Sequence, residues 1–481
     1  MRTVVTCIIK VTALVMQPPC QNLLNADRVM DDRTRLLLTA PPIPLLARMS
    51  APNSIAFFIQ AGVSMTEVWF IGQLGSASLA AIALVFPLLM LTQTLSGGAM
   101  GGAVASAVAR ALGAGDRERG EQLIWHALAL AALGALLLLT LFGLFGVSFL
   151  RFLGGSNDTL NQAVSYCLVL FSGGIFLWLM GVVSAIYRGM GDMKFPALVM
   201  TASAFVQVPL SGALVLGAFG APQLGIVGAA VSAVVTAGLL SGVMILRLVL
   251  GNTVIKIRWT QFGFEARHFK EILKVALPAA LSPVLTVTSI LCLTAIIGRF
   301  GEQALAGYGI GSRIEFLLIP LVFGIGASMT SLVGMSVGAG DIKRAEHICW
   351  VGGMGSALLA GVIGISLALF PEFWIPAFTE DPVVQAAAKQ YIQIVGPCFA
   401  FQGLGLSLYF ACQGAGVMFW PVVSLLLRAI LAVGGALILI NITDWGLAGV
   451  FYAAGFGMVI YGIIMVSALK LGALRRGQSS P

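Results

Sequence analysis

Two acidic side chains, Glu67 and Glu315, stand inside long apolar runs, where a charge needs an explanation. Glu67 follows Asn53, Gln60 and Ser64 at intervals of seven, four and three residues, which places the four on one face of a helix. A polar face on an apolar helix is expected to line a water-filled cavity. Burial raises the pKa of a carboxyl group, as a proton carrier requires. We therefore expect Glu67 to couple to an ion; the alternative is a hydrated structural acid near a membrane edge.

Glu315 has two interpretations. Arg313 stands two residues away, and residues two apart on a helix face different ways. Arg428 is a charge of opposite sign in another apolar run, and an ion pair would let both side chains remain in a membrane. Glu315 is therefore either a second ion-coupling residue or the structural partner of Arg428.

Aromatic side chains in the apolar runs could recognise a substrate, because their faces bind flat cations and apolar rings alike. The alternative is ordinary packing. The residues expected to line a substrate cavity are Trp178, Tyr187, Tyr308 and Tyr409, together with Asn53, Gln60, Ser64 and Arg428.

The composition excludes an ordinary soluble domain. Of the 481 residues, 59% are hydrophobic and 10% are charged, whereas a soluble domain has roughly 25% charged residues. The apolar surface must face lipid, and a chain that crosses a bilayer must satisfy its backbone internally. The net charge of +8 falls in short loops, which is typical of membrane orientation and excludes a nucleic-acid-binding face.

Twelve apolar runs are long enough to cross a bilayer as helices. They predict an all-α integral membrane protein with spans at about 51–71, 78–108, 123–149, 160–187, 195–217 and 224–249, and at 274–297, 303–335, 348–370, 383–411, 421–440 and 446–469.

Lys and Arg gather in alternate loops, which places both termini in the cytoplasm. The predicted parts are a cytoplasmic tail (1–44), an N-lobe (45–250), a cytoplasmic connector (251–273), a C-lobe (274–470) and a cytoplasmic C-terminal tail (471–481). The connector mixes bases with aromatics. It either lies along the lipid headgroups or is an ordinary positive-inside loop.

The chain contains an internal duplication with an offset of 221 to 226 residues. Each half has six spans, so both halves enter the membrane from the same side and the repeat is parallel. Such lobes can rock to expose a central site to alternate sides, which favours a carrier over an enzyme. The paired segments are RMSAP and KVALP, IGQLGSASLA and IGRFGEQALA, LGAGDRERGEQLIW and VGAGDIKRAEHICW, YRGMGDMKFP and CQGAGVMFWP, and GIVGAAVSA and GLAGVFYAA.

The sequence has no motif for nucleotide binding, metal binding or catalysis. The glycine cluster SGGAMGGAVASA suits close helix packing, and no glycine cluster carries a phosphate-loop lysine, so no nucleotide is expected. The histidines, His126, His268 and His347, show no metal-ligand spacing, and no catalytic Ser/His/Asp set is present. We expect no cofactor, no metal and no enzymatic activity.

The ordered motifs resemble the multidrug and toxic compound extrusion (MATE) family from about residue 45 to residue 470. The resemblance implies two six-helix lobes, a central cavity open to one side at a time, and export coupled to inward flow of protons or sodium. The residues that carry it are Gly72, Gly75, Leu79 and Ala80, then Gly113, Gly115 and Asp116, then Gly189, Gly191, Asp192 and Pro196, with their second-half counterparts.

The resemblance also implies roles for single residues. Glu67 stands five residues before Gly72, where similar members often carry an aspartate, so it becomes the proton or cation site. The sodium-coupled branch usually places acids in helices 7 and 10, and this chain has none in their cores, which favours protons. We expect a monomer in the bacterial inner membrane that exports cationic or amphipathic compounds. A lipid-linked oligosaccharide flippase and a narrow-specificity metabolite exporter are the alternatives.

Overall fold

The structure is a computed structural model that describes residues 32–251 and 253–476, and their regular secondary structure is helical throughout. The chain divides into two compact units. The described part of unit 1 comprises residues 32–38 and 55–273 apart from 252, and that of unit 2 comprises residues 39–54 and 274–476. All three boundaries fall inside helices, because α2 (Asp32–Thr39), α3 (Pro42–Gly72) and α11 (Ala266–Ile297) each contribute residues to both units.

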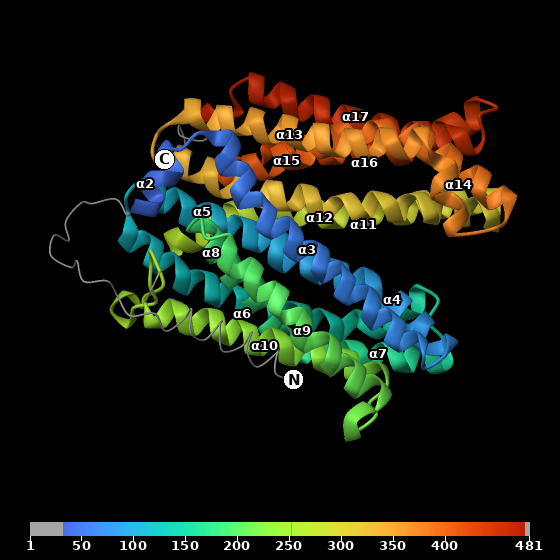
Figure 1. Cartoon of the computed structure of the whole chain (residues 1–481), viewed down its shortest axis with the longest axis horizontal. Helices are drawn as coiled ribbons and strands as arrows, with labels where there is room; N and C mark the ends of the chain where they lie inside the picture. The colour runs from blue at the N-terminus through green and yellow to red at the C-terminus, as the bar shows by residue number, and fades with distance from the viewer. Residues whose placement is uncertain (1–31, 252, 477–481) are drawn as a thin grey trace. The chain divides into compact units, whose positions relative to one another are not determined.

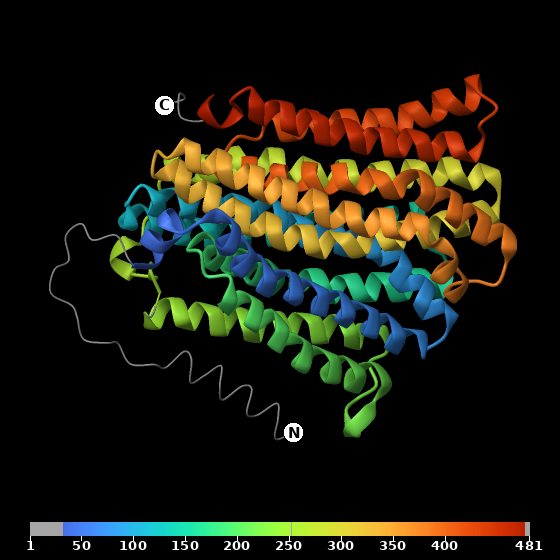
Figure 2. The ribbon, with the colours of Figure 1, turned by 45° about the horizontal axis from the view of Figure 1, so that its top comes forward.

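Unit 1 is a bundle of helices that run side by side, with α9 against α10 and α5 against α8 (Figures 1 and 2). Besides its parts of α2, α3 and α11, it contains α4 (Ser76–Gln93), the π-helix η1 (Thr94–Met100), α5 (Gly101–Gly113), α6 (Arg117–Phe152), α7 (Asn157–Ser172), α8 (Gly174–Gly189), α9 (Lys194–Leu216), η2 (Ala218–Gly220), α10 (Ile226–Leu250) and η3 (Trp259–Gln261).

Unit 2 is a second helical bundle, in which α16 packs along α17 and α13 along α15 (Figure 2). Besides its parts of α2, α3 and α11, it contains η4 (Gly298–Phe300), α12 (Glu302–Gly338), α13 (Ile342–Leu369), η5 (Pro371–Phe373), η6 (Ile375–Ala377), α14 (Pro382–Val395), η7 (Gly396–Cys398), α15 (Phe399–Ala415), α16 (Phe419–Ile442), α17 (Leu447–Lys470) and α18 (Ala473–Arg476).

The candidate spans match the predicted runs. Eleven helical stretches in the described residues are long and apolar enough to cross a membrane, and α7 with α8 makes a twelfth if the bent pair is one span. That pair bends by 53° at Gly173 and Gly174. Gly173 lies so close to Val234 of α10 that a side chain there would clash, so the break coincides with a tight helix contact.

The repeated LGAGD segment folds as a Schellman turn. The Gly115 N–H donates to the Leu112 carbonyl (3.0 Å), and the Asp116 N–H donates to the Ala111 carbonyl (2.9 Å). Gly115 has a φ of 74°, a left-handed conformation that glycine adopts without strain. The Asp116 carboxylate then caps α6 by accepting from the Arg119 N–H (3.0 Å). One aspartate therefore follows the closing turn of one helix and opens the next.

The second-half counterpart, VGAGD, repeats this turn. Gly340 has a φ of 78°. The Asp341 N–H donates to the Ser336 carbonyl (2.9 Å), and its carboxylate accepts from the Arg344 N–H (2.9 Å). Gly191 and Gly416, from the YRGMGD and CQGAGV pair, share φ values of 76° and 77°. These two repeated motifs thus form equivalent corners in the two halves of the chain.

Candidate functional site

Gln60 and Glu67 of α3 each face a polar residue of α9 inside unit 1. The Gln207 amide donates to the Glu67 carboxylate (2.9 Å), and the Ser203 hydroxyl lies 3.5 Å from the Gln60 side-chain oxygen. Gln207 is itself positioned by α10, because the Ser232 hydroxyl donates to its backbone carbonyl (3.0 Å). Two polar pairs therefore join α3 to α9.

Glu67 forms no ion pair with any Lys or Arg that the structure describes. Its hydrogen-bond partner is a neutral amide, which cannot offset a negative charge. A carboxylate in apolar surroundings is costly, and binding a proton removes that charge. The arrangement can therefore take up and release a proton at one side chain.

The other residues of the predicted polar stripe lie in different surroundings. Ser64 is exposed, whereas Asn53 is buried and belongs to the part of α3 that is in unit 2. The structure brings Gln60 and Glu67 to one partner helix. A role for Asn53 and Ser64 in lining a cavity stays a prediction.

Glu315 lies in a cluster of unit 2. Its carboxylate is 3.7 Å from the Arg428 guanidinium, and it accepts a hydrogen bond from the Tyr391 hydroxyl (2.9 Å). The Tyr308 ring meets the Tyr391 ring edge-on, and Arg428 also lies 5.8 Å from the centre of the Tyr461 ring. The charge of Glu315 is therefore offset by a cation, unlike that of Glu67.

The predicted aromatic residues are packed inside their own units. Trp178 of α8 lies against Gly134 of α6, where a larger side chain would clash with its ring. Tyr187 is fully buried and donates to the Met244 carbonyl (2.9 Å), while Tyr409 donates to the Ala279 carbonyl (3.4 Å). The structure shows packing for these side chains, and their contact with a substrate stays a prediction.

Several partners were missed by the sequence analysis. Ser203 and Gln207 stand four residues apart in an apolar span, a spacing that could have indicated a polar helix face. Tyr391 gave no such signal, because one tyrosine in a span is as often a packing residue. His126 and His268, which showed no metal spacing, have ring centres 5.0 Å apart. No group of three His, Cys, Asp or Glu suited to a metal occurs within residues 32–251 and 253–476.

Two helical units with up to twelve candidate spans, and acids held inside them, define the class: a polytopic membrane transporter. The MatE family model matches residues 52–212 and 278–438. These segments cover more than half of the chain, so the chain belongs to the MatE family. They are also equal in length and offset by 226 residues (278 − 52), the spacing of the internal repeat.

Individual relatives agree with this membership. The chain is 28% identical over 434 residues to the probable multidrug resistance protein NorM of Thermotoga maritima, covering 89% of this chain and 90% of that protein. It is 27% identical to an FAD transporter of Shewanella oneidensis, covering 78% and 82%. A solved MOP superfamily transporter from Pyrococcus furiosus matches with a TM-score of 0.87 and 22% identity, covering 94% of this chain and all of that one.

These findings confirm the predicted fold class and family. The chain is a multi-pass membrane transporter that acts on small molecules, and it is not an enzyme.

Proposed function

We propose that this chain exports small organic compounds, cationic or amphipathic, in exchange for protons that bind at Glu67. It works by alternating access in the bacterial inner membrane, with both termini in the cytoplasm. Relatives named as multidrug resistance proteins support the substrate class, and the distribution of Lys and Arg supports the orientation.

The observation that carries the proposal is the difference between the two acids. Glu67 is held by the neutral Gln207, whereas Glu315 is paired with Arg428. A transported proton needs a site whose charge is not already compensated, since only such a site changes its electrostatic energy strongly on protonation. Glu67 therefore carries the coupling, and Glu315 positions the helices of unit 2.

A second candidate function is export of one anionic metabolite, for which the FAD transporter of Shewanella oneidensis is the specific reason. Flavin dinucleotides carry phosphates, so this function requires basic side chains at the substrate site. Arg428 is a candidate for that contact, although Glu315 already engages it.

The test is transport by the purified chain in liposomes. Uptake of a fluorescent cationic dye is followed under an imposed pH gradient, with a sodium gradient and a flavin dinucleotide efflux assay in parallel. We expect the pH gradient to drive dye uptake and Glu67→Gln to reduce it to the level of protein-free liposomes. Glu302→Gln, the same change at an exposed acid of α12, is the control and should transport normally.

Each outcome separates one part of the proposal. Persistent pH-driven uptake in Glu67→Gln would exclude this residue as the coupling site but not the export of dye. Uptake driven by sodium alone would contradict proton coupling. Flavin efflux without dye uptake would replace the proposed function with the second candidate.

A further inference from the structure

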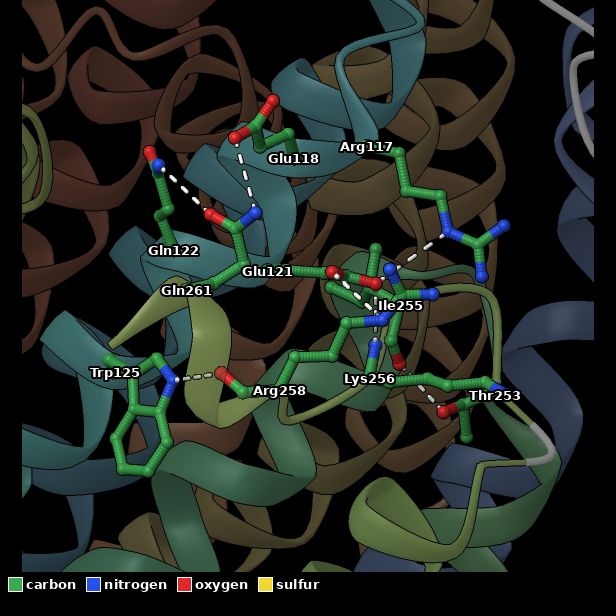
Figure 3. Close-up of polar contacts among 10 residues, drawn as sticks. All are labelled: Arg117, Glu118, Glu121, Gln122, Trp125, Thr253, Ile255, Lys256, Arg258 and Gln261. Carbon is green, nitrogen blue, oxygen red and sulfur yellow. Dashed lines mark hydrogen bonds and ion pairs between the residues drawn. The ribbon is translucent and has the colours of Figure 1, made fainter. Parts of the chain in front are cut away.

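The connector between α10 and α11 is fixed to the start of α6 by a buried acid. Glu121 is 3% exposed, and its carboxylate accepts from the Lys256 N–H (3.3 Å) (Figure 3). The Arg258 and Arg117 guanidinium groups lie 3.5 and 3.7 Å from the same carboxylate. The buried carboxylate of Glu121 therefore holds the connector, at Lys256 and Arg258, against α6.

Further contacts continue along the connector. Gln261 accepts from Gln122 (3.2 Å) and donates to Glu118 (3.1 Å), and Trp125 donates to the Arg258 carbonyl (3.2 Å) (Figure 3).

At the end of the connector, His126 of α6 accepts from the Glu265 N–H (2.9 Å), while its other ring nitrogen lies 2.8 Å from the Gln122 carbonyl. The connector is therefore held against α6 by contacts along its length.

This fixed segment leaves three large aromatic side chains exposed. Trp259 is 76% exposed, Phe262 54% and Phe264 55%. Trp259 and Phe262 pack against Trp125 of α6, with ring centres 5.1 and 5.0 Å away, so α6 helps to hold these rings in place. Exposed aromatic rings next to membrane spans are typical of the bilayer interface.

Basic residues stand close to these rings in the sequence. Arg258, Arg267 and Lys270 are exposed. We define the connector surface as Arg258, Trp259, Phe262, Phe264, Arg267 and Lys270.

The acids of the segment offset only part of this charge. Glu271 is already paired with Arg110 (3.3 Å) and Arg119 (2.6 Å), and the buried Glu121 is shared by Arg117 and Arg258. Glu265 is the exposed acid within the connector, and Glu118 binds Gln261. The exposed charge of the surface is therefore positive.

We propose that the connector surface binds anionic phospholipid of the leaflet that it faces, with Trp259, Phe262 and Phe264 in the interface and Arg267 and Lys270 at the headgroup phosphates. The connector joins α10, which ends at Leu250, to α11, which begins at Ala266, and both are candidate spans. It therefore lies at a bilayer boundary, where positive charge attracts anionic headgroups. This inference does not depend on the transported substrate.

The test is tryptophan fluorescence of the full chain in phosphatidylcholine vesicles that contain phosphatidylglycerol, with bromine on the acyl chains of one lipid at a time. The difference between wild type and Trp259→Phe isolates the Trp259 signal. We expect brominated phosphatidylglycerol to be preferred at Trp259 about fivefold or more at equal mole fraction, since one base near an anionic surface contributes roughly that factor. Trp445, an exposed tryptophan before α17, is the matched control and should show no preference.

Charge variants decide whether the surface itself is responsible. Arg267→Gln with Lys270→Gln should equalise quenching by the two lipids at Trp259. The control pair, Lys343→Gln with Lys470→Gln, removes two exposed bases from unit 2 and should keep the preference.

Four results would overturn the proposal. They are absence of quenching at Trp259, equal quenching by both lipids in wild type, loss of the preference in the control pair, and competition by free glycerol phosphate, which would indicate a site for a soluble anion.

Discussion

Glu67 and Glu315 show how the same side chain acquires different chemistry from its neighbours. A neutral amide holds Glu67, so a charge there is uncompensated, whereas a guanidinium and a phenol hold Glu315. Removing one partner of an ion pair that is partly withdrawn from water strongly destabilises the fold, because the other charge is left without compensation. The two acids should therefore respond differently to mutation: Glu67 through transport and Glu315 through folding.

We expect Glu315→Gln and Arg428→Gln each to lower the free energy of unfolding by roughly 2 kcal/mol, less than for a fully buried pair because both side chains keep some exposure. Tyr391→Phe should cost about 1 kcal/mol, the contribution of one hydrogen bond. Thermal unfolding in detergent measures these effects. The charge-swapped double variant, Glu315→Arg with Arg428→Glu, should recover part of the loss in stability and transport, and recovery of neither would contradict the pairing.

The sequence predicted partners only where charge left few choices. Arg428 was the buried charge of opposite sign available to Glu315, so their pairing followed from the cost of a lone charge. Gln207 and Tyr391 were not predicted, because a neutral polar side chain in a span has many acceptable partners. His126 and His268 meet only because the connector folds back onto α6, and no spacing in the sequence encodes that return.

At the scale of elements, four of the five repeated motif pairs include a corner between helices, and the fifth, RMSAP and KVALP, lies inside α3 and α11. Gly115, Gly191, Gly340 and Gly416 share a left-handed conformation within a narrow range of φ. Lipid-facing helical surfaces tolerate exchange among apolar residues, whereas a left-handed corner strongly favours glycine. This difference explains why the duplication is visible at the corners and weak between them.

Two glycine corners with the same backbone provide a matched pair of variants. Gly115→Ala should lower the free energy of unfolding by about 1–2 kcal/mol, the cost of a left-handed alanine, because no other atom lies within reach of the new methyl group. Gly191→Ala should cost more, since its methyl group would meet the Leu37 side chain of α2. Thermal unfolding measures both.

Limited proteolysis of the same variants locates the effect. We expect cleavage near α2 to increase in Gly191→Ala alone, because Arg33 of α2 also binds the Gly191 carbonyl (3.3 Å) and Asp192 (3.2 Å). Equal stability and equal cleavage in the two variants would show that the packing of Leu37 against Gly191 does not hold α2 in place.

Span positions were predictable to within several residues, because about twenty apolar residues are what a bilayer requires. The break between α7 and α8 was not predicted, since the run at 160–187 is continuous in hydropathy. Two adjacent glycines mark the break, but the chain has 58 glycines and most lie elsewhere. The tight contact with Val234, which only the fold reveals, distinguishes this pair.

At the scale of the whole molecule, each chain contains both halves of the duplication and both acid clusters, so we expect a single chain to transport by itself. Vesicles reconstituted with mixtures of wild type and Glu67→Gln should take up dye in proportion to the wild-type fraction. A curve that falls below this line would indicate that two chains share one transport cycle. Sparse reconstitution, with at most one protein per vesicle, provides the control.

The chain passes from one unit to the other inside α3 and again inside α11, and this limits how the units can move. At these two places the units are not joined by a flexible loop, because the helix continues on both sides of the boundary. In the alternating-access cycle that we propose, rotation of one unit against the other has to bend or twist these two helices. Each helix has a proline close to the unit boundary, Pro52 in α3 and Pro278 in α11. The missing N–H of proline lowers the energy needed to bend the helix there. Two of the connections between the units are therefore continuous helices, each with a proline at an equivalent point of the repeat.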